Sequence, residues 1–139
     1  MTTTDASTST STPQRKTRKI TLTDARPVQI YEDEWPVIAQ GDYDEHDGQV
    51  RAQANRVTEV RVRVREHADG RRIVYGVYSY SSNWQTERSV DARAGYLLGA
   101  EDDVIAAIRR VQADLEARDA EHVREAADDC IADLPAERI

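Results

Sequence analysis

Three arginines alternate with valines between Val60 and Arg65, and their types and spacing could form a binding surface. Successive side chains of a β-strand point to opposite faces, so Arg61, Arg63 and Arg65 share one face at intervals of about 6.6–6.8 Å. Guanidinium groups at this spacing can contact phosphates, and neighbouring aromatic rings can stack on bases. The aromatic candidates are Tyr78, Tyr80 and Trp84. The segment therefore predicts a nucleic-acid surface, or else the solvent-exposed face of a hairpin whose charges discourage pairing with other chains.

A second candidate surface is acidic. Residues 24–47 hold eight carboxylates and one arginine, and the last forty residues hold twelve carboxylates and five arginines. Carboxylates on a rigid domain can imitate DNA phosphates or dock in an arginine-lined channel, although such charge is also typical of a solvated helix face. The acidic candidates for partner binding are Glu32, Asp33, Glu34, Asp42 and Asp44.

Residues that could support catalysis or bind a metal are not clustered in the sequence. His46, His67 and His122 lack the spacing of zinc ligands. Cys130 follows His122 by eight residues, about 12 Å along a helix, too far for a nucleophile and its base. The segment 42–48 is not an EF-hand, because the sixth position lacks glycine and the twelfth lacks glutamate. We therefore expect that the protein is not an enzyme and that it has no catalytic residue, cofactor or metal.

The elements that must position these surfaces are strands followed by helices. Alternating apolar residues predict strands at 20–22, 35–43, 49–55 and 57–66, and another at about 84–90. Residues 24–27 and 44–48 are predicted as turns, and residues 32–34 could form a short helical turn. Apolar stripes then predict helices at about 101–117 and 123–134.

The turn around Asp69-Gly70 admits two hairpin registers. A two-residue type I′ loop pairs Val62 with Val77, whereas a three-residue loop with a glycine bulge places the arginines opposite Ile73, Tyr75 and Val77. We favour the first register because it gathers six apolar residues on one core face. They are Val60, Val62, Val64, Ile73, Tyr75 and Val77.

The fold class that follows is α+β: an antiparallel, meander-like sheet of about four or five strands with two C-terminal helices on one face. The length of 139 residues fits a single domain, which we assign to residues 18–139 after a disordered Ser/Thr-rich tail at 1–17. The sequence holds one cysteine and no apolar run long enough for a membrane span. These features predict a cytoplasmic protein.

Four stretches carry a resemblance: KITLTDARPVQI, DEWPVIA, HADGRRIVYGVY and CIADLPAERI. Over residues 18–139 the chain resembles small accessory proteins that phages and other mobile elements encode. The resemblance implies a cytoplasmic protein acting on host machinery, as inhibitors of defence systems such as CRISPR effectors do. It assigns a role to no individual residue.

These observations favour a non-enzymatic interaction protein, an accessory protein that inhibits or modulates a host protein through its acidic surface or its Arg/Tyr sheet face. A host defence complex that processes nucleic acid is the expected partner. One alternative is a protein that binds nucleic acid directly through the Arg/Tyr face. Another is a small subunit of a homo- or hetero-oligomer. No membrane partner is expected.

Overall fold

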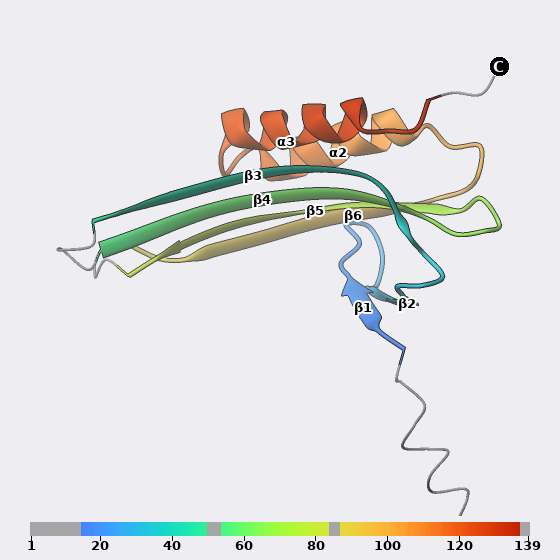
Figure 1. Ribbon diagram of the computed structural model, residues 1–139, viewed down its shortest axis with the longest axis horizontal. Helices are drawn as coiled ribbons and strands as arrows, with labels where there is room; N and C mark the ends of the chain where they lie inside the picture. Colours follow the sequence, from blue (N-terminus) through green and yellow to red (C-terminus); the bar gives the residue numbers. More distant parts are fainter. Residues whose placement is uncertain (1–14, 50–53, 84–86, 137–139) are drawn as a thin grey trace, which may run out of the picture.

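The chain folds into one long antiparallel sheet with helices on one face and a small strand pair on the other (Figure 1). The computed structural model describes residues 15–49, 54–83 and 87–136. The main sheet has the order β3-β4-β5-β6, and β1 pairs with β2 in a separate sheet. The bounds are β1 Thr17–Ile20, β2 Val28–Tyr31, β3 Val37–Gln49, β4 Ala54–Glu66, β5 Arg72–Ser82, β6 Val90–Leu98, α2 Val104–Leu115 and α3 Ala120–Ala132. The predicted α+β class, meander and C-terminal helices are confirmed.

The main core lies between the sheet and the two helices. Val60, Val62 and Val64 of β4 are fully buried there, as the alternation predicted. Gly41 of β3 lets α3 lie directly on the strand, since a Cβ at this position would stand 1.9 Å from the carbonyl oxygen of Ala126. Helix–sheet contact is therefore close enough to require glycine at this point.

Both helices begin at an aspartate that caps them. The Asp103 carboxylate accepts hydrogen bonds from the backbone N–H groups of Ile105 and Ala106, at 3.0 and 3.2 Å. The Asp119 carboxylate accepts one from His122 N–H. Such caps satisfy N–H groups that have no partner within the helix, which explains why the helices start where they do.

A second apolar cluster lies on the opposite face of the sheet and was not predicted. The β1–β2 pair covers one end of that face. In the segment between these two strands, the Thr23 N–H donates a hydrogen bond to the Gly95 carbonyl at the edge of β6, at 2.8 Å. The cluster consists of Ile20, Leu22, Ile30, Trp35, Ile73 and Tyr75. Part of the sheet is therefore buried on both faces.

The favoured hairpin register is wrong, and the three-residue loop is the one observed. Arg61 pairs with Val77, Arg63 with Tyr75 and Arg65 with Ile73. Gly70 has a φ of 95°, and its N–H donates to the His67 carbonyl. This register still buries Ile73 and Tyr75, because both residues pack in the second apolar cluster, on the sheet face opposite the helices. The other register would place all six apolar residues in a single core, whereas the sheet has an apolar cluster on each face.

Three strand boundaries also differ from those predicted. Residues 44–48 continue β3 as a strand paired with β4 and do not form a turn. The last strand begins at Val90, where it was expected to end, because its apolar residues pack under α2. β1 starts at Thr17, and residues 32–34 form the short helical turn. In the described ranges, no helix is long and apolar enough to cross a membrane.

Candidate interaction surface

The first two arginines of the predicted row lie on the open face but are engaged by carboxylates of the adjacent strand. Arg61 Nη2 lies 2.7 Å from Asp44 Oδ1, and Arg63 Nη1 donates a short hydrogen bond to Asp42. The bond to Asp44 raises the pKa of Arg61 further above its ordinary value. β3 thus supplies one carboxylate opposite each guanidinium group, so the face is close to neutral.

The third arginine is not exposed, which corrects its predicted position. Arg65 is only 6% exposed and lies beneath the β1–β2 side of the molecule. Its Nε donates to the Tyr75 hydroxyl and its Nη1 to the Trp35 carbonyl, both at 2.9 Å. Arg65 is therefore a structural residue of the second apolar cluster.

The predicted aromatic partners do not join the arginine face. Tyr78 is buried among the core residues under the helices, opposite Val60. Tyr80 points to that same side, and its hydroxyl donates to Glu87 at 3.0 Å. Trp84 lies outside the described residues. The predicted Arg/Tyr surface is thus divided between the two faces of the sheet, which follows from the alternation of side chains along β4 and β5.

The acidic turn before β3 is also paired. Arg15 lies 2.8 Å from Asp33 and 3.1 Å from Glu34, and Arg18 lies 3.2 Å from Glu32. Arg15 and Arg18 therefore balance two of the three negative charges of this cluster. All five acidic residues singled out from the sequence take part in ion pairs, and whether they bind a partner stays a prediction.

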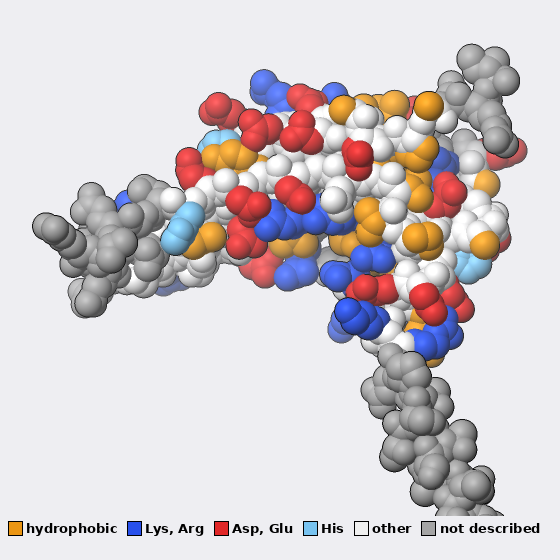
Figure 2. Space-filling view, in the orientation of Figure 1, with side chains coloured by type: hydrophobic (Ala, Val, Ile, Leu, Met, Phe, Trp, Pro, Cys, Tyr) orange, Lys and Arg blue, Asp and Glu red, His pale blue; other side chains and the backbone are white. Residues whose placement is uncertain are grey.

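A different acidic surface runs along the seam between α3 and β3, and sequence reasoning missed it. We call it the acidic ridge. It comprises Glu45, Glu121, Glu125, Asp129 and Asp133. In the described parts of the chain, no Lys or Arg nitrogen lies within 4.0 Å of these five carboxylates. Figure 2 shows acidic side chains gathered over α3 and the adjoining strand.

The helical members of the acidic ridge follow a simple spacing. Glu121, Glu125, Asp129 and Asp133 stand at successive intervals of four residues, so they form one row about 6 Å apart along the axis. This spacing was visible in the sequence. Only the contact between α3 and β3 adds Glu45 to the row, because residue 45 was expected in a turn.

The seam beneath the acidic ridge joins a stacked pair of rings to a carboxylate. The rings of Tyr43 and His122 lie 3.9 Å apart at an angle of 9°, and His122 Nδ1 lies 2.6 Å from Asp119. Burial and the Glu45 carboxylate raise the pKa of the Tyr43 hydroxyl. Burial alone would lower the pKa of His122, but the bond to Asp119 and the charges of Glu45 and Glu121 outweigh it and raise that pKa. The Glu45 carboxylate contributes to both shifts.

Cys130 lies in the core and not at a reactive site. It is fully buried, and burial raises the pKa of its thiol to about 12. Within the described ranges, no group of three or more His, Cys, Asp or Glu side chains is arranged to hold a metal ion.

Comparisons with protein-family models, curated proteins and solved structures find no match to this chain.

Proposed function

We propose that the protein is a non-enzymatic interaction protein that binds a basic surface of a partner protein through its acidic ridge. The observation that carries this proposal is the row of carboxylates on α3 that lack basic partners in the described part of the chain. The two arginines of the open face, by contrast, are paired with carboxylates: Arg61 with Asp44 and Arg63 with Asp42. Among the described residues, the negative charge of the acidic ridge is therefore not balanced by ion pairs with Lys or Arg.

The placement of these carboxylates is unfavourable for α3 itself. Like charges four residues apart destabilise a helix by roughly 0.2–0.5 kcal/mol per pair. Asp129 also lies near the C-terminal end, where the helix dipole favours positive charge, and the last turn contains no basic residue. Asp133 at the C-cap, by contrast, accepts a hydrogen bond from the Gln40 N–H at 2.9 Å. A partner that supplies arginine or lysine would relieve both effects, which supports a binding role for the acidic ridge.

The resemblance to mobile-element accessory proteins supports a class of partner. Host defence complexes that process nucleic acid carry arginine-lined channels, and a row of carboxylates is complementary to such a channel. We therefore propose an inhibitor or modulator of such a complex as the biological role. Direct binding of nucleic acid has less support, because the guanidinium groups of Arg61 and Arg63 are already paired with Asp44 and Asp42.

The test is affinity capture from bacterial lysate with matched charge variants. The first variant combines Glu125→Gln with Asp129→Asn in the acidic ridge. The control combines Asp91→Asn with Glu101→Gln, which removes the same charge from exposed positions elsewhere. We expect nuclease-resistant capture of a protein with a basic surface by the wild type and the control, and its loss in the acidic-ridge variant. Capture that disappears with nuclease, or that is equal in all three proteins, would refute the proposal.

A further inference from the structure

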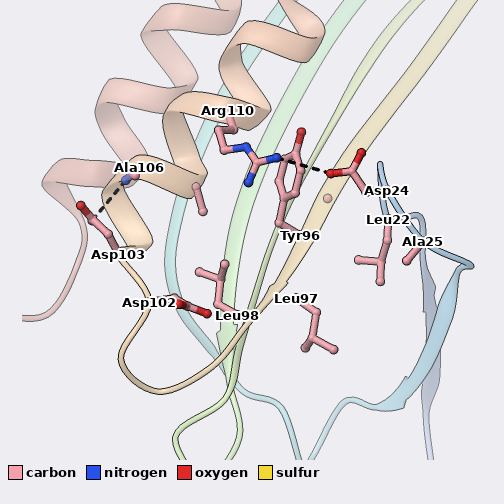
Figure 3. A pocket seen from close by; sticks show the side chains of 12 residues that line it. Leu22, Asp24, Ala25, Tyr96, Leu97, Leu98, Asp102, Asp103, Ala106 and Arg110 are labelled. Atoms are coloured by element: carbon pink, nitrogen blue, oxygen red, sulfur yellow. Dashed lines mark hydrogen bonds and ion pairs between the residues drawn. The ribbon is translucent and has the colours of Figure 1, made fainter.

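A groove lies beside the edge of β6, away from the acidic ridge, and we call it the β6 groove. It encloses about 500 Å³ between α2 and the segment that follows β1. Its lining includes Leu22, Asp24, Tyr96, Leu97, Leu98 and Ala106. Figure 3 shows the helix on one side, the segment with Leu22 and Ala25 on the other, and β6 between them.

The edge of β6 is already hydrogen-bonded to one residue of the segment between β1 and β2. The Gly95 N–H donates to Thr23 Oγ1 at 3.1 Å, and the Gly95 carbonyl accepts from Thr23 N–H at 2.8 Å. The backbone groups of Gly95 therefore point away from β5. In an antiparallel ladder this orientation repeats every second residue, so the N–H and C=O of Leu97 point the same way.

On the side of Gly95 that faces the β6 groove, the edge is open at Leu97. The backbone groups of Gly99, two residues on, are bonded within the chain: its N–H donates to Asp102 Oδ2 at 2.7 Å and its carbonyl accepts from Asp102 N–H. Among the described residues, nothing is hydrogen-bonded to the outward groups of Leu97. Its side chain is 47% exposed at the mouth of the groove.

The walls of the β6 groove select for a positively charged occupant with an aliphatic side chain. Asp24, Asp102 and Asp103 outnumber the single basic residue, Arg110, which lies 3.4 Å from Asp24 across the groove and over the Tyr96 ring. Exposed Leu97 and Ala106 supply apolar contact. An unpaired strand edge beside a helix is the arrangement that accepts an extended peptide as an added strand.

We propose that the β6 groove binds an extended segment of a partner protein, in which an aliphatic residue opposite Leu97 is flanked by lysine or arginine. The incoming residue exchanges two backbone hydrogen bonds with Leu97 and continues the pairing that Thr23 begins at Gly95. This site is separate from the acidic ridge, so it stands or falls independently of the proposed function.

The test uses a short fluorescent peptide of alternating leucine and lysine, titrated into the ¹⁵N-labelled protein. We expect resonance shifts at Leu97 and Ala106 and slower hydrogen exchange of the Leu97 amide. N-methylation of the leucine amides, which removes backbone donors from the peptide, should weaken binding about tenfold if one or two hydrogen bonds are lost. Replacing lysine with glutamate should abolish binding.

Matched variants separate this site from the rest of the surface. Ala106→Phe fills the groove from an exposed helical position and should weaken the peptide at least about tenfold through lost access. In Ala113→Phe, also exposed on α2, and in Glu125→Gln/Asp129→Asn, the peptide-induced shifts at Leu97 and Ala106 should remain as in the wild type. The proposal would be overturned if the N-methylated peptide bound as tightly as the unmodified one, or if the resonance shifts were confined to the acidic ridge. It would also be overturned if sedimentation showed a dimer whose contact occupies the groove.

Discussion

Arg65 provides the sharpest test of a sheet that is buried on both faces. Alternation along β4 places Arg65 with Arg61, yet the structure gives the two residues different surroundings. Replacement of Arg65 by serine removes hydrogen bonds to the Tyr75 hydroxyl and the Trp35 carbonyl, and it leaves both of these oxygen atoms without that donor. Arg61 sits on the open face, 32% exposed, and pairs with Asp44.

The expected magnitudes follow from this difference. Hydrogen bonds to charged groups contribute about 1.5–3 kcal/mol each, and release of the buried charge offsets part of the loss, so Arg65→Ser should lower the free energy of unfolding by about 3 kcal/mol. Arg61→Ser should cost less than about 1 kcal/mol, because exposed ion pairs contribute little. Arg65→Met, which retains the aliphatic stem, should fall between them.

Urea denaturation monitored by circular dichroism measures these differences in the free energy of unfolding. The comparison requires that the slope of this free energy against urea concentration is the same in all variants. Equal midpoints for Arg65→Ser and Arg61→Ser would refute the reasoning. The Arg65 side chain would then be solvated, and the β1–β2 pair would not cover this end of the sheet.

Other predictions concern the helix contact, the loop before β6, and the core thiol. Gly41→Ala should unfold the protein or lower its melting temperature sharply, because the new Cβ meets the backbone of α3 at Ala126; Gly99→Ala, whose Cβ would make only an ordinary contact with Asp102 Oδ2 at 3.5 Å, is the comparison. Hydrogen bonds from Arg56, Ser82 and Tyr80 lower the pKa of Glu87 to about 2, so its stabilising effect is complete above the unfolded pKa near 4.5. Wild type should lose this advantage over Glu87→Gln as the pH falls from about 4.5 to about 2, and a pH-independent difference in melting temperature would contradict the assignment. Cys130 should react with a thiol reagent only after denaturant is added, and rapid labelling of the native protein would show that the core is open.

Local patterns predicted the elements that pack under the helices. The alternation of Val60, Val62 and Val64 identified a face of β4, and the apolar spacing of α2 and α3 identified their buried sides. These signals work because each element repeats its own geometry over many residues. The core between the helices and the sheet was therefore predictable from the sequence.

The second face of the sheet was not predictable in the same way. The alternation of Ile20 and Leu22 predicted a strand that overlaps β1 only at Ile20, and β2 was not predicted. Four-residue strands carry few alternations, and the packing of this pair on the sheet depends on contacts with β5, which is distant in the sequence. The prediction did not include the β1–β2 pair as a cover for the second face. Ile73 and Tyr75 were therefore assigned to the same face as the valines, which gave the wrong hairpin register. The same omission left Arg65 exposed in the prediction.

The candidate site was predictable in charge but not in position. Composition identified two acidic blocks, yet ion pairing depends on which strand lies beside which. β3 places Asp42 and Asp44 beside Arg63 and Arg61, which removes them from the free negative surface. The row on α3 was present in the sequence as a four-residue repeat, but its importance is apparent only once its partners are known.

The most direct measurement compares two labelled probes at low salt by fluorescence anisotropy: an arginine-rich peptide and a single-stranded RNA. The account predicts that the peptide binds, that its affinity falls as salt rises, and that Glu125→Gln/Asp129→Asn weakens it, whereas the RNA does not bind. Contradiction would come from RNA binding with a steep salt dependence that disappears in Arg61→Ser/Arg63→Ser. In that case the arginines, and not the acidic ridge, would form the interaction surface.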